Sequence, residues 1–389
     1  MRLGLWLPRM SYLRVLGPVA AVARLRGWDV VAFCPKGGPK SDAAGQRAAV
    51  SRQIGGAAVV VEGATEATAA IRSWRPKAIL SASVKVEDWV HVVMGETRDT
   101  CLWGAVGYLQ EEIVWTLMEG PRVLRIWDFV TTGSEQGRDQ LAAHYPLMCV
   151  GDDIKRKLVV TGYPPLDTFH SLTREACRAK FGIKPDERVI LFIPAARPWG
   201  LSWWRRAAFD GPLAWAAPAL GVPSYRRVVA AVIRYAHRHS ARIIMKTRAK
   251  NQDPAWLDTA FSQVVGDESW YPHTTLELLK AADLYIGIAS ATAVEAAAAG
   301  VPSLHIFTWP DVANVPAYVP FRKEFFHESL LWHPRLQADR DPRLLEDWAE
   351  GAEWQSSNPR PAERVIRPMC GTVDGLASDR VMDAVEARV

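Results

Sequence analysis

The sequence predicts an α/β protein built from two domains, each containing a doubly wound parallel sheet. The chain has 389 residues, which exceeds one ordinary core and suits two domains of the usual ~100–200 residues. Short apolar runs alternate with helical stretches, as they do where crossover helices join parallel strands. The alternation starts a second time near Arg188. We expect a first domain over residues 1–175, a second over residues 176–370, and a closing helix within residues 371–389 that crosses back to the first domain.

The first domain opens with a strand, a helix and a second strand. An apolar run at residues 3–7 precedes a periodic helix over residues 13–26, which ends at Gly27, and a second run at residues 29–34. This β-loop-α-β order indicates parallel strands. Further apolar runs continue the pattern at residues 57–61, 78–81, 123–131 and 158–161.

The second domain repeats this alternation. A strand over residues 188–194 is followed by a helical stretch at residues 225–239 and a strand at residues 242–246. A helix and a strand follow in LELLKAADLYIGI, and the helix in ATAVEAAAAGVPSLHIF stops at Gly300, just before another strand. The last amphipathic helix is expected over residues 377–388.

Composition indicates a soluble globular protein in a reducing compartment. Hydrophobic residues make up 49% and charged residues 23% of the chain, and the net charge of +5 is too small to identify nucleic acid as a partner. The five scattered cysteines show neither a disulfide framework nor zinc-ligand spacing. No signal peptide or long apolar segment is visible. We expect a cytoplasmic protein, with peripheral contact at the inner face of a membrane left open.

The segment LYIGIASATAVEAAAAGV carries the strongest chemical signal. A buried strand leads into the small-residue turn Ser290-Ala291-Thr292, on which a helix opens. Helix N–H groups and two hydroxyls suit a phosphate, and Glu295 stands where an acceptor for ribose hydroxyls is expected. An alternative explains the same spacing, with Ser290 or Thr292 as an N-cap and Glu295 as its capping-box partner.

Cations follow two other strands of the second domain. Arg197 comes after VILFIP, and Lys246 and Arg248 come after the strand IIM. The carboxyl ends of parallel strands meet at one edge, so these cations are candidates to neutralise a diphosphate. Each could instead be a solvated loop cation. His305, in the last strand, is a further candidate for the nucleotide site, or a core histidine.

These segments together resemble the GT-B superfamily, which includes nucleotide-sugar glycosyltransferases, UDP-N-acetylglucosamine 2-epimerase, lipid-A-disaccharide synthase and the CDP-glycerol glycerophosphotransferases. The resemblance rests on VVTGYPPLDTF, FIPAARP, MKTR, AADLYIGIASATAVEAAAAGVPSLHIF and DGLASDRVMDAV, which cover about half the chain in the family's order. It implies two Rossmann-like domains facing across a cleft. It also implies that Ser290, Thr292 and Glu295 bind the diphosphate and ribose of a nucleotide. Ser290-Ala291-Thr292 departs from the Ser-Gly-Gly of the epimerases, and Thr247-Arg248 departs from the His-Pro of the glycerophosphotransferases.

The resemblance favours a glycosyltransferase that moves a sugar from a nucleotide-diphosphate donor, such as a UDP-sugar, to a glycan, lipid-linked or small-molecule acceptor in polysaccharide biosynthesis. The donor is a co-substrate, and no other cofactor is expected. We expect no metal, because a helix dipole and cations can stabilise the leaving diphosphate. Three alternatives stay open: a 2-epimerase-like isomerase, a CDP-glycerol glycerophosphotransferase-like enzyme, and a non-catalytic nucleotide-sugar-binding protein.

The first domain should supply the acceptor site and the general base. Candidates for the base are His91, Glu96 and Glu111, of which Glu96 is preferred because it follows the apolar run VHVVMG in an expected loop. Arg9, Ser11 and Tyr12, in the loop after the first strand, are candidates to contact acceptor or sugar. Any of these could be an ordinary surface residue.

The oligomeric state is open. The segment PWGLSWWRRAAF at residues 198–209 suits either sugar stacking or a membrane interface, or else core packing or an oligomer contact.

Overall fold

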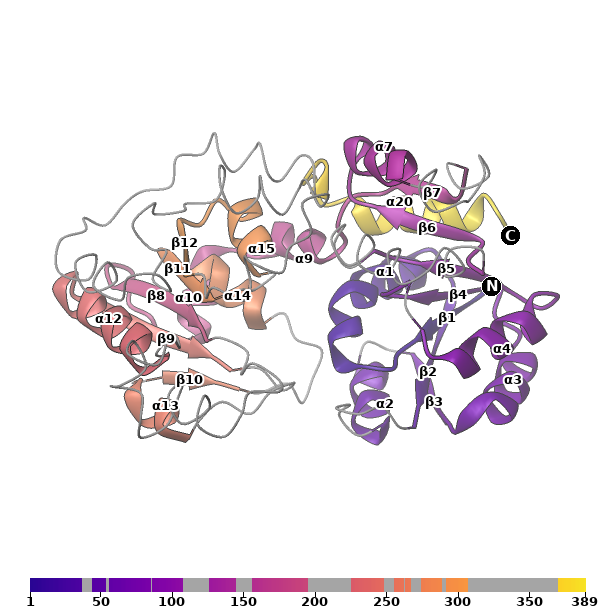
Figure 1. Ribbon diagram of the computed structural model, residues 1–389, viewed down its shortest axis with the longest axis horizontal. Coiled ribbons are helices and arrows are strands. Elements are labelled where there is room, and N and C mark those ends of the chain that lie inside the picture. The colour runs from indigo at the N-terminus through magenta and orange to yellow at the C-terminus, as the bar shows by residue number, and fades with distance from the viewer. Residues whose placement is uncertain are drawn as a thin grey trace. The chain divides into compact units, whose positions relative to one another are not determined.

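The computed structural model consists of two compact units (Figure 1). It describes residues 1–36, 44–53, 56–84, 86–107, 126–144, 156–194, 225–247, 255–261, 263–266, 274–288, 292–306 and 370–389. The first unit takes in the described residues up to Ser171 and those from Cys370 onward, and the second takes in those from Leu172 to Ile306. The break after Ser171 lies close to the boundary expected at residue 175.

Within the described residues, the first unit holds a seven-stranded sheet in the order β3-β2-β1-β4-β5-β6-β7, with every neighbouring pair parallel. Its strands are β1 (Arg2–Trp6), β2 (Asp29–Pro35), β3 (Ala57–Val61), β4 (Ala78–Ser81), β5 (Leu102–Ala105), β6 (Phe129–Thr132) and β7 (Leu158–Val160). Its helices are η1 (Met10–Tyr12), α1 (Leu13–Leu25), α2 (Ala44–Gln53), α3 (Gly63–Trp74), α4 (Asp88–Thr97), α7 (Glu135–His144), α9 (Pro165–Ser171) and α20 (Ala377–Glu386).

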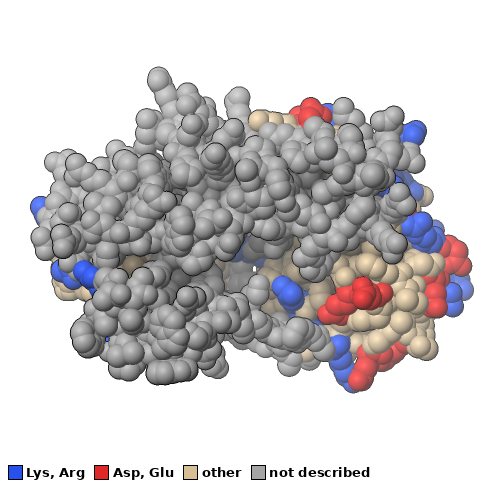
Figure 2. Space-filling view, viewed as in Figure 1, with Lys and Arg blue, Asp and Glu red and all other residues tan. Residues whose placement is uncertain are grey.

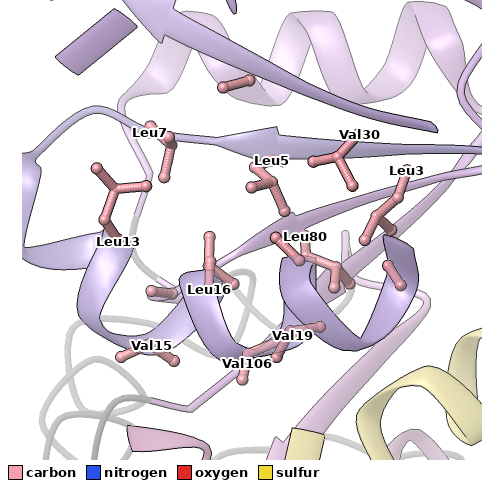
Figure 3. Close-up of a cluster of buried hydrophobic side chains, with 14 of the residues drawn as sticks. Leu3, Leu5, Leu7, Leu13, Val15, Leu16, Val19, Val30, Leu80 and Val106 are labelled. Atoms are coloured by element: carbon pink, nitrogen blue, oxygen red, sulfur yellow. The ribbon is translucent and has the colours of Figure 1, made fainter. Parts of the chain in front are cut away.

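Alternation along β1 sends side chains to both faces of this sheet. Leu3 and Leu5 lie fully buried on one face, where they pack against Leu16 and Val19 of α1 (Figure 3). Trp6 lies on the other face, in a second cluster to which α3 and α4 contribute. Helices therefore cover both faces, which confirms the doubly wound α/β class.

The closing helix α20 belongs to the first unit and packs on α1. Val381, Met382 and Val385 join the same apolar cluster as α1. Just after α1, the Arg26 guanidinium contacts three carboxylates of α20, at 2.8 Å from Asp379, 2.7 Å from Asp383 and 3.0 Å from Glu386. Apolar burial and this ion-pair cluster together hold the C-terminal segment on the N-terminal one.

Two segments singled out in the sequence, VVTGYPPLDTF and DGLASDRVMDAV, contact each other. The Asp167 carboxylate accepts hydrogen bonds from the backbone N–H of Ala377 at 3.0 Å and of Ser378 at 2.6 Å, so a distant residue caps α20. Burial raises the pKa of Asp167. Arg380 pairs with Asp374 and also donates to the carbonyl of Thr161 at 3.4 Å.

The second unit holds, within the described residues, a five-stranded parallel sheet in the order β10-β9-β8-β11-β12. Its strands are β8 (Arg188–Ile193), β9 (Ala241–Lys246), β10 (Gln263–Val265), β11 (Leu284–Ile288) and β12 (Ser303–Ile306). Its helices are α10 (Arg174–Lys180), α12 (Tyr225–Arg238), α13 (Ala255–Ala260), α14 (Thr274–Ala281) and α15 (Thr292–Ala298). Residues of α12 and α13 share an apolar cluster with β8, β9 and β11.

Charged side chains stabilise the amino ends of β8 and β11 through hydrogen bonds and ion pairs. The Asp283 carboxylate accepts from the backbone N–H of Val189 at 2.8 Å and also pairs with Arg174. The side chain of Arg178 is 6% exposed and donates to the carbonyl of Ala281 at 3.0 Å. Such a buried guanidinium is stable only because carbonyl and carboxylate oxygens surround it.

The elements match the predicted ones with a few differences. The strands at residues 57–61 and 78–81 are confirmed at both ends, whereas β5 and β10 were not predicted. The strand expected over residues 123–131 begins only at Phe129 among the described residues. No helix in the described part of the chain combines the length and apolar character needed to span a membrane.

Replacement of Gly95 by alanine should stabilise the first unit. Gly95 lies inside α4, and a Cβ there meets no atom within 4 Å. We expect Gly95→Ala to raise the free energy of unfolding by about 0.5–1 kcal/mol, because alanine loses less backbone entropy in a helix. Urea denaturation followed by tryptophan fluorescence measures this change, since Trp6, Trp103 and Trp127 are buried in this unit.

The matched control is Gly371→Ala. Gly371 has φ 68°, and an added Cβ would lie 2.2 Å from the carbonyl oxygen of Gly133. This substitution should destabilise the protein by at least about 1 kcal/mol. Equal effects of the two substitutions would contradict the described backbone.

The Asp374–Arg380 pair should make stability depend on pH in the acid range. The hydrogen bond from Arg380 lowers the pKa of Asp374. Its stabilisation is therefore present above the ordinary aspartate pKa of about 3.9 and is lost as pH falls through the lowered value. Asp374→Asn should cost about 1 kcal/mol at neutral pH and progressively less below pH ~4. Urea denaturation at several pH values checks this, with the exposed Asp29→Asn as control. A cost independent of pH would contradict it.

Candidate functional site

The order of the strands in the second unit points to one edge of its sheet. From β8 the chain first builds β9 and β10 on one side, then β11 and β12 on the other. In open α/β sheets, ligands bind outside the carboxyl ends of the strands where this reversal occurs. The reversal lies between β8 and β11. Ligand-binding residues are therefore expected in the segments that follow β8, β9 and β11.

Strand register aligns three residues at this edge. Ile193 of β8 pairs with Gly287 of β11, which pairs with His305 of β12. On the other side, Phe192 pairs with Met245, so Lys246 is the next residue at the end of β9. The sequence prediction that Lys246 and His305 approach one edge is thus consistent with the backbone. The side chain of His305 lies outside the described residues.

Lys246 brings a positive charge to the end of β9. The residue is 4% exposed, and its ammonium donates to the carbonyl oxygen of Thr247 at 2.8 Å. Thr247 in turn continues the sheet, because its backbone N–H donates to Val265 at 3.0 Å. A cation held at the carboxyl edge of a parallel sheet suits a phosphate or diphosphate.

Helix α15 opens after β11, as the sequence predicts, but it is short. It runs for 7 residues from Thr292, which is 4% exposed. Glu295, in its first turn, is 1% exposed. The capping and ribose-binding interpretations of Thr292 and Glu295 both stay predictions.

Several predicted site residues lie outside the described residues: Glu111, Arg197, Arg248, Ser290 and Ala291. The tryptophan-rich segment at residues 198–209 lies outside them as well.

The first unit has a comparable edge, formed where its strand order reverses between β1 and β4. The loop after β1 contains Arg9 and Ser11, both exposed, and the partly exposed Tyr12, which ends η1. The segment after β4 leads into α4. The predicted substrate residues therefore follow β1 at the carboxyl edge of the sheet, just as the start of α4 follows β4.

His91 and Glu96, two of the predicted bases, lie at different ends of α4. His91 is in the first half of the helix, which follows the carboxyl end of β4. Its side chain is half-buried, and its Nε2 atom is buried without a hydrogen-bond partner in the described part of the chain. Imidazole nitrogens serve as general bases, so His91 stays a candidate base.

The expectation that Glu96 lies in a loop is wrong. Glu96 is in the last turn of α4, whose end leads to the amino end of β5. Its carbonyl accepts a hydrogen bond at 2.8 Å from Arg72, itself in the last turn of α3. Because a crossover helix returns the chain to the opposite edge of the sheet, Glu96 lies away from the carboxyl ends. The reason for preferring it as the base therefore disappears.

Sequence reasoning missed Trp89, in the first turn of α4. Trp89 is half-buried, and its ring packs edge-on against Trp6, with centroids 5.6 Å apart. Its Nε1 donates to the Glu87 carboxylate at 2.7 Å, which fixes the ring orientation. The high tryptophan content was the available signal. Part of that content forms the core, since Trp6, Trp103 and Trp127 follow one another in edge-on contacts.

The described part of the chain shows neither a reactive thiol nor a cluster of metal ligands. The four cysteines described there form no disulfide and are buried, and burial raises the pKa of Cys101 and Cys370 to about 12. No group of three His, Cys, Asp or Glu side chains among the described residues could hold a metal ion. One Asp-x-Asp sequence occurs, Asp339 to Asp341, outside the described residues.

No family model and no curated protein matches this sequence. The structure is nevertheless similar to several solved structures. The UDP-N-acetylglucosamine 2-epimerase of Neisseria meningitidis bound to UDP-N-acetylglucosamine is 11% identical, with a TM-score of 0.60 over 100% of both chains. The S. aureus MnaA–UDP structure is 11% identical, with a TM-score of 0.57 over 99% of this chain and 96% of that one. The wall teichoic acid polymerase TagF is 10% identical, with a TM-score of 0.56 over 100% of this chain and 88% of that one.

These likenesses extend over the whole chain and concern the fold. Together with the two parallel sheets, they show the fold, two doubly wound α/β units.

Proposed function

We propose that this protein is a glycosyltransferase that takes a sugar from a nucleotide-diphosphate donor. One observation carries the proposal: Lys246 places a cation at the carboxyl edge of the second sheet, beside the reversal of strand order. Two of the similar structures hold UDP or UDP-N-acetylglucosamine, which supports a nucleotide as the ligand of this edge. The acceptor is a glycan, lipid-linked or small-molecule hydroxyl compound.

The proposed reaction needs a base for the acceptor and a cation for the leaving group. In a direct displacement, the acceptor oxygen forms a bond to the anomeric carbon, and the bond from that carbon to the diphosphate oxygen breaks. The base that we propose for the acceptor proton is His91. The Lys246 ammonium stabilises the negative charge that develops on the leaving diphosphate. This scheme uses no metal, and a test with a chelator is part of the assay below.

Two related reactions would use the same nucleotide edge. An isomerase of the 2-epimerase type would eliminate and re-add the nucleotide within one substrate, and the full-length likeness to a 2-epimerase favours it as the second candidate. A CDP-glycerol glycerophosphotransferase-like reaction would move a phosphoglycerol group in place of a sugar, in line with the likeness to TagF.

Replacement of Lys246 should weaken nucleotide binding. Lys246→Met removes the ammonium, and we expect the Kd for a nucleoside diphosphate to rise about tenfold to a hundredfold, or about 1.5–3 kcal/mol. Isothermal titration calorimetry with UDP, GDP and CDP measures the change. Lys184→Met is the matched control, because Lys184 is exposed in the same unit and precedes β8 at the opposite edge. Equal affinity of the folded Lys246 variant and the wild type would contradict the assignment.

Replacement of His91 should stop transfer without removing nucleotide binding. We expect His91→Gln to lower kcat by about a hundredfold or more, because a positioned base contributes that much to proton transfer. Glu96→Gln, at the other end of α4, is the control and should leave kcat within about twofold.

The assay incubates the protein with UDP-, GDP- and CDP-linked donors, with and without acceptors and chelator, and measures free nucleotide and sugar identity. Nucleotide release that requires an acceptor supports transfer. A donor sugar that is altered without an acceptor would show epimerisation in place of transfer. Transfer of phosphoglycerol from the CDP-linked donor would show the glycerophosphotransferase reaction. A chelator that abolishes activity would contradict the metal-free scheme.

A further inference from the structure

A tryptophan ring lies at the carboxyl edge of the first sheet, where the strand order reverses. Trp6 is the last residue of β1 and pairs with Ser81, the last residue of β4. The order of the strands reverses between β1 and β4, and ligands of open α/β sheets bind at such a reversal, outside the carboxyl ends. The ring of Trp89 has its centroid 5.6 Å from that of Trp6. Trp89 therefore lies at the edge where a ligand of the first unit is expected.

The rings on which Trp89 packs form a fixed support. Trp6 is 1% exposed, and Trp103 and Trp127 continue the row of edge-on contacts, with centroids 5.8 and 6.4 Å apart, and are fully buried. Trp89 is the half-buried end of this row, and the hydrogen bond from its Nε1 to Glu87 constrains it further. A side chain that is already ordered loses little conformational entropy when a ligand packs on it.

The surroundings of the Trp89 ring combine apolar surface with hydrogen-bond acceptors. Val92 comes three residues later in α4, on the same side of the helix, and is 51% exposed. Glu87 and Asp88, immediately before the ring in the sequence, are both exposed. Figure 2 shows Asp and Glu side chains beside uncharged surface in the region where Figure 1 places α3 and α4. This edge therefore offers a ligand an aromatic ring and carboxylate oxygens.

This combination selects the class of ligand. An ionised carboxylate only accepts hydrogen bonds, so the ligand must bring donors. A pyranose sugar has a face of C–H groups that packs on an aromatic ring, and it has hydroxyl donors along its rim. An acyl chain has no donors, and the two carboxylates would repel a phosphate or phosphoglycerol group. An uncharged sugar satisfies both requirements.

We propose that Trp89 binds the acceptor by stacking on an uncharged sugar ring, while Glu87 and Asp88 accept hydrogen bonds from its hydroxyls. The acceptor is then a carbohydrate. The inference rests on the proposed function for the role of this sugar as acceptor, whereas the binding of the sugar can be measured without any reaction.

The first test applies the labelled full chain to an array of neutral and acidic glycans. The wild type should bind neutral glycans in preference to acidic ones. Trp89→Ala should weaken this binding about tenfold, because the stacked ring is lost. Trp89→Phe keeps a smaller ring against Trp6 and should show an intermediate loss, and it carries the test if the alanine variant does not fold.

Trp74 provides the matched control. It is half-buried in the same unit, in the last turn of α3, which leads to the amino end of β4. Its ring centroid lies 5.7 Å from the guanidinium carbon of Arg2, the first residue of β1. Trp74→Ala and Trp74→Phe should bind glycans like the wild type, because this ring lies at the opposite edge of the sheet.

The second test is the transfer assay with a bound neutral glycan as acceptor. Trp89→Ala should raise KM for that acceptor by more than it lowers kcat, and the Kd for UDP should stay unchanged. Equal glycan binding by the Trp89 and Trp74 variants, a preference for acidic glycans, no binding of neutral glycans by the wild type, or a loss of UDP affinity in Trp89→Ala would each overturn the inference. Glycan binding that depends on Trp89, without transfer from any donor, would overturn the proposed function and support the sugar site.

Discussion

The common direction of the strands within each sheet is the constraint on which the other features depend. A parallel strand can follow another only through a crossover that carries the chain back to the starting edge. Every segment that leaves a strand therefore emerges at one edge, and every helix ends at the other. Lys246, His305, Arg9 and Ser11 share the emerging edges of their sheets for this reason, although they are far apart in the sequence. The same rule sends Glu96 to the opposite edge.

The two edges of the second sheet are built from different chemistry. At the amino edge, Arg178 donates to the carbonyl of Ala281 and to the Asp283 carboxylate, which also accepts from the backbone N–H of Val189. Both charged groups are therefore paired within the unit. At the carboxyl edge, Lys246 ends a strand, and the segments that follow are rich in hydroxyls and cations. The described contacts of the amino edge are thus internal to the unit, and the carboxyl edge carries the residues that we propose for a ligand.

In the first unit, the N-terminal helix α1 and the C-terminal helix α20 pack against each other in one apolar cluster. Arg26 and the buried face of α20 join the two ends through charge and apolar contact. Asp167 caps α20 from the end of the first unit's own N-terminal portion. The segments before and after the second unit are therefore fastened to each other. The segments VVTGYPPLDTF and DGLASDRVMDAV therefore contribute capping and ion-pair contacts rather than catalytic groups.

Much of the fold could be predicted from the sequence, because it depends on local patterns. The runs at residues 57–61 and 78–81 are short and mostly apolar, and both match strands to the residue. β5 was not predicted because LWGA is only four residues long and contains a glycine. Glu96 was placed in a loop because Gly95 interrupts the apolar run, yet the helix continues through Thr97.

The candidate site was less predictable, since burial depends on packing between distant segments. Nothing local distinguishes a buried Glu295 from an exposed one, because its burial depends on the packing of α15 against β11 and β12. The orientation of the half-buried Trp89 ring likewise depends on its contact with Trp6, which is distant in the sequence. Residue type and spacing located the edge of the sheet, but not which side chains a ligand could reach there.

The most direct measurement is a crystal structure of the protein with a bound nucleoside diphosphate. We expect the diphosphate at the carboxyl edge of the second sheet, next to the ends of β8 and β11 and with an oxygen within hydrogen-bond distance of the Lys246 ammonium. A nucleotide bound at the amino edge, or in the first unit alone, would contradict it.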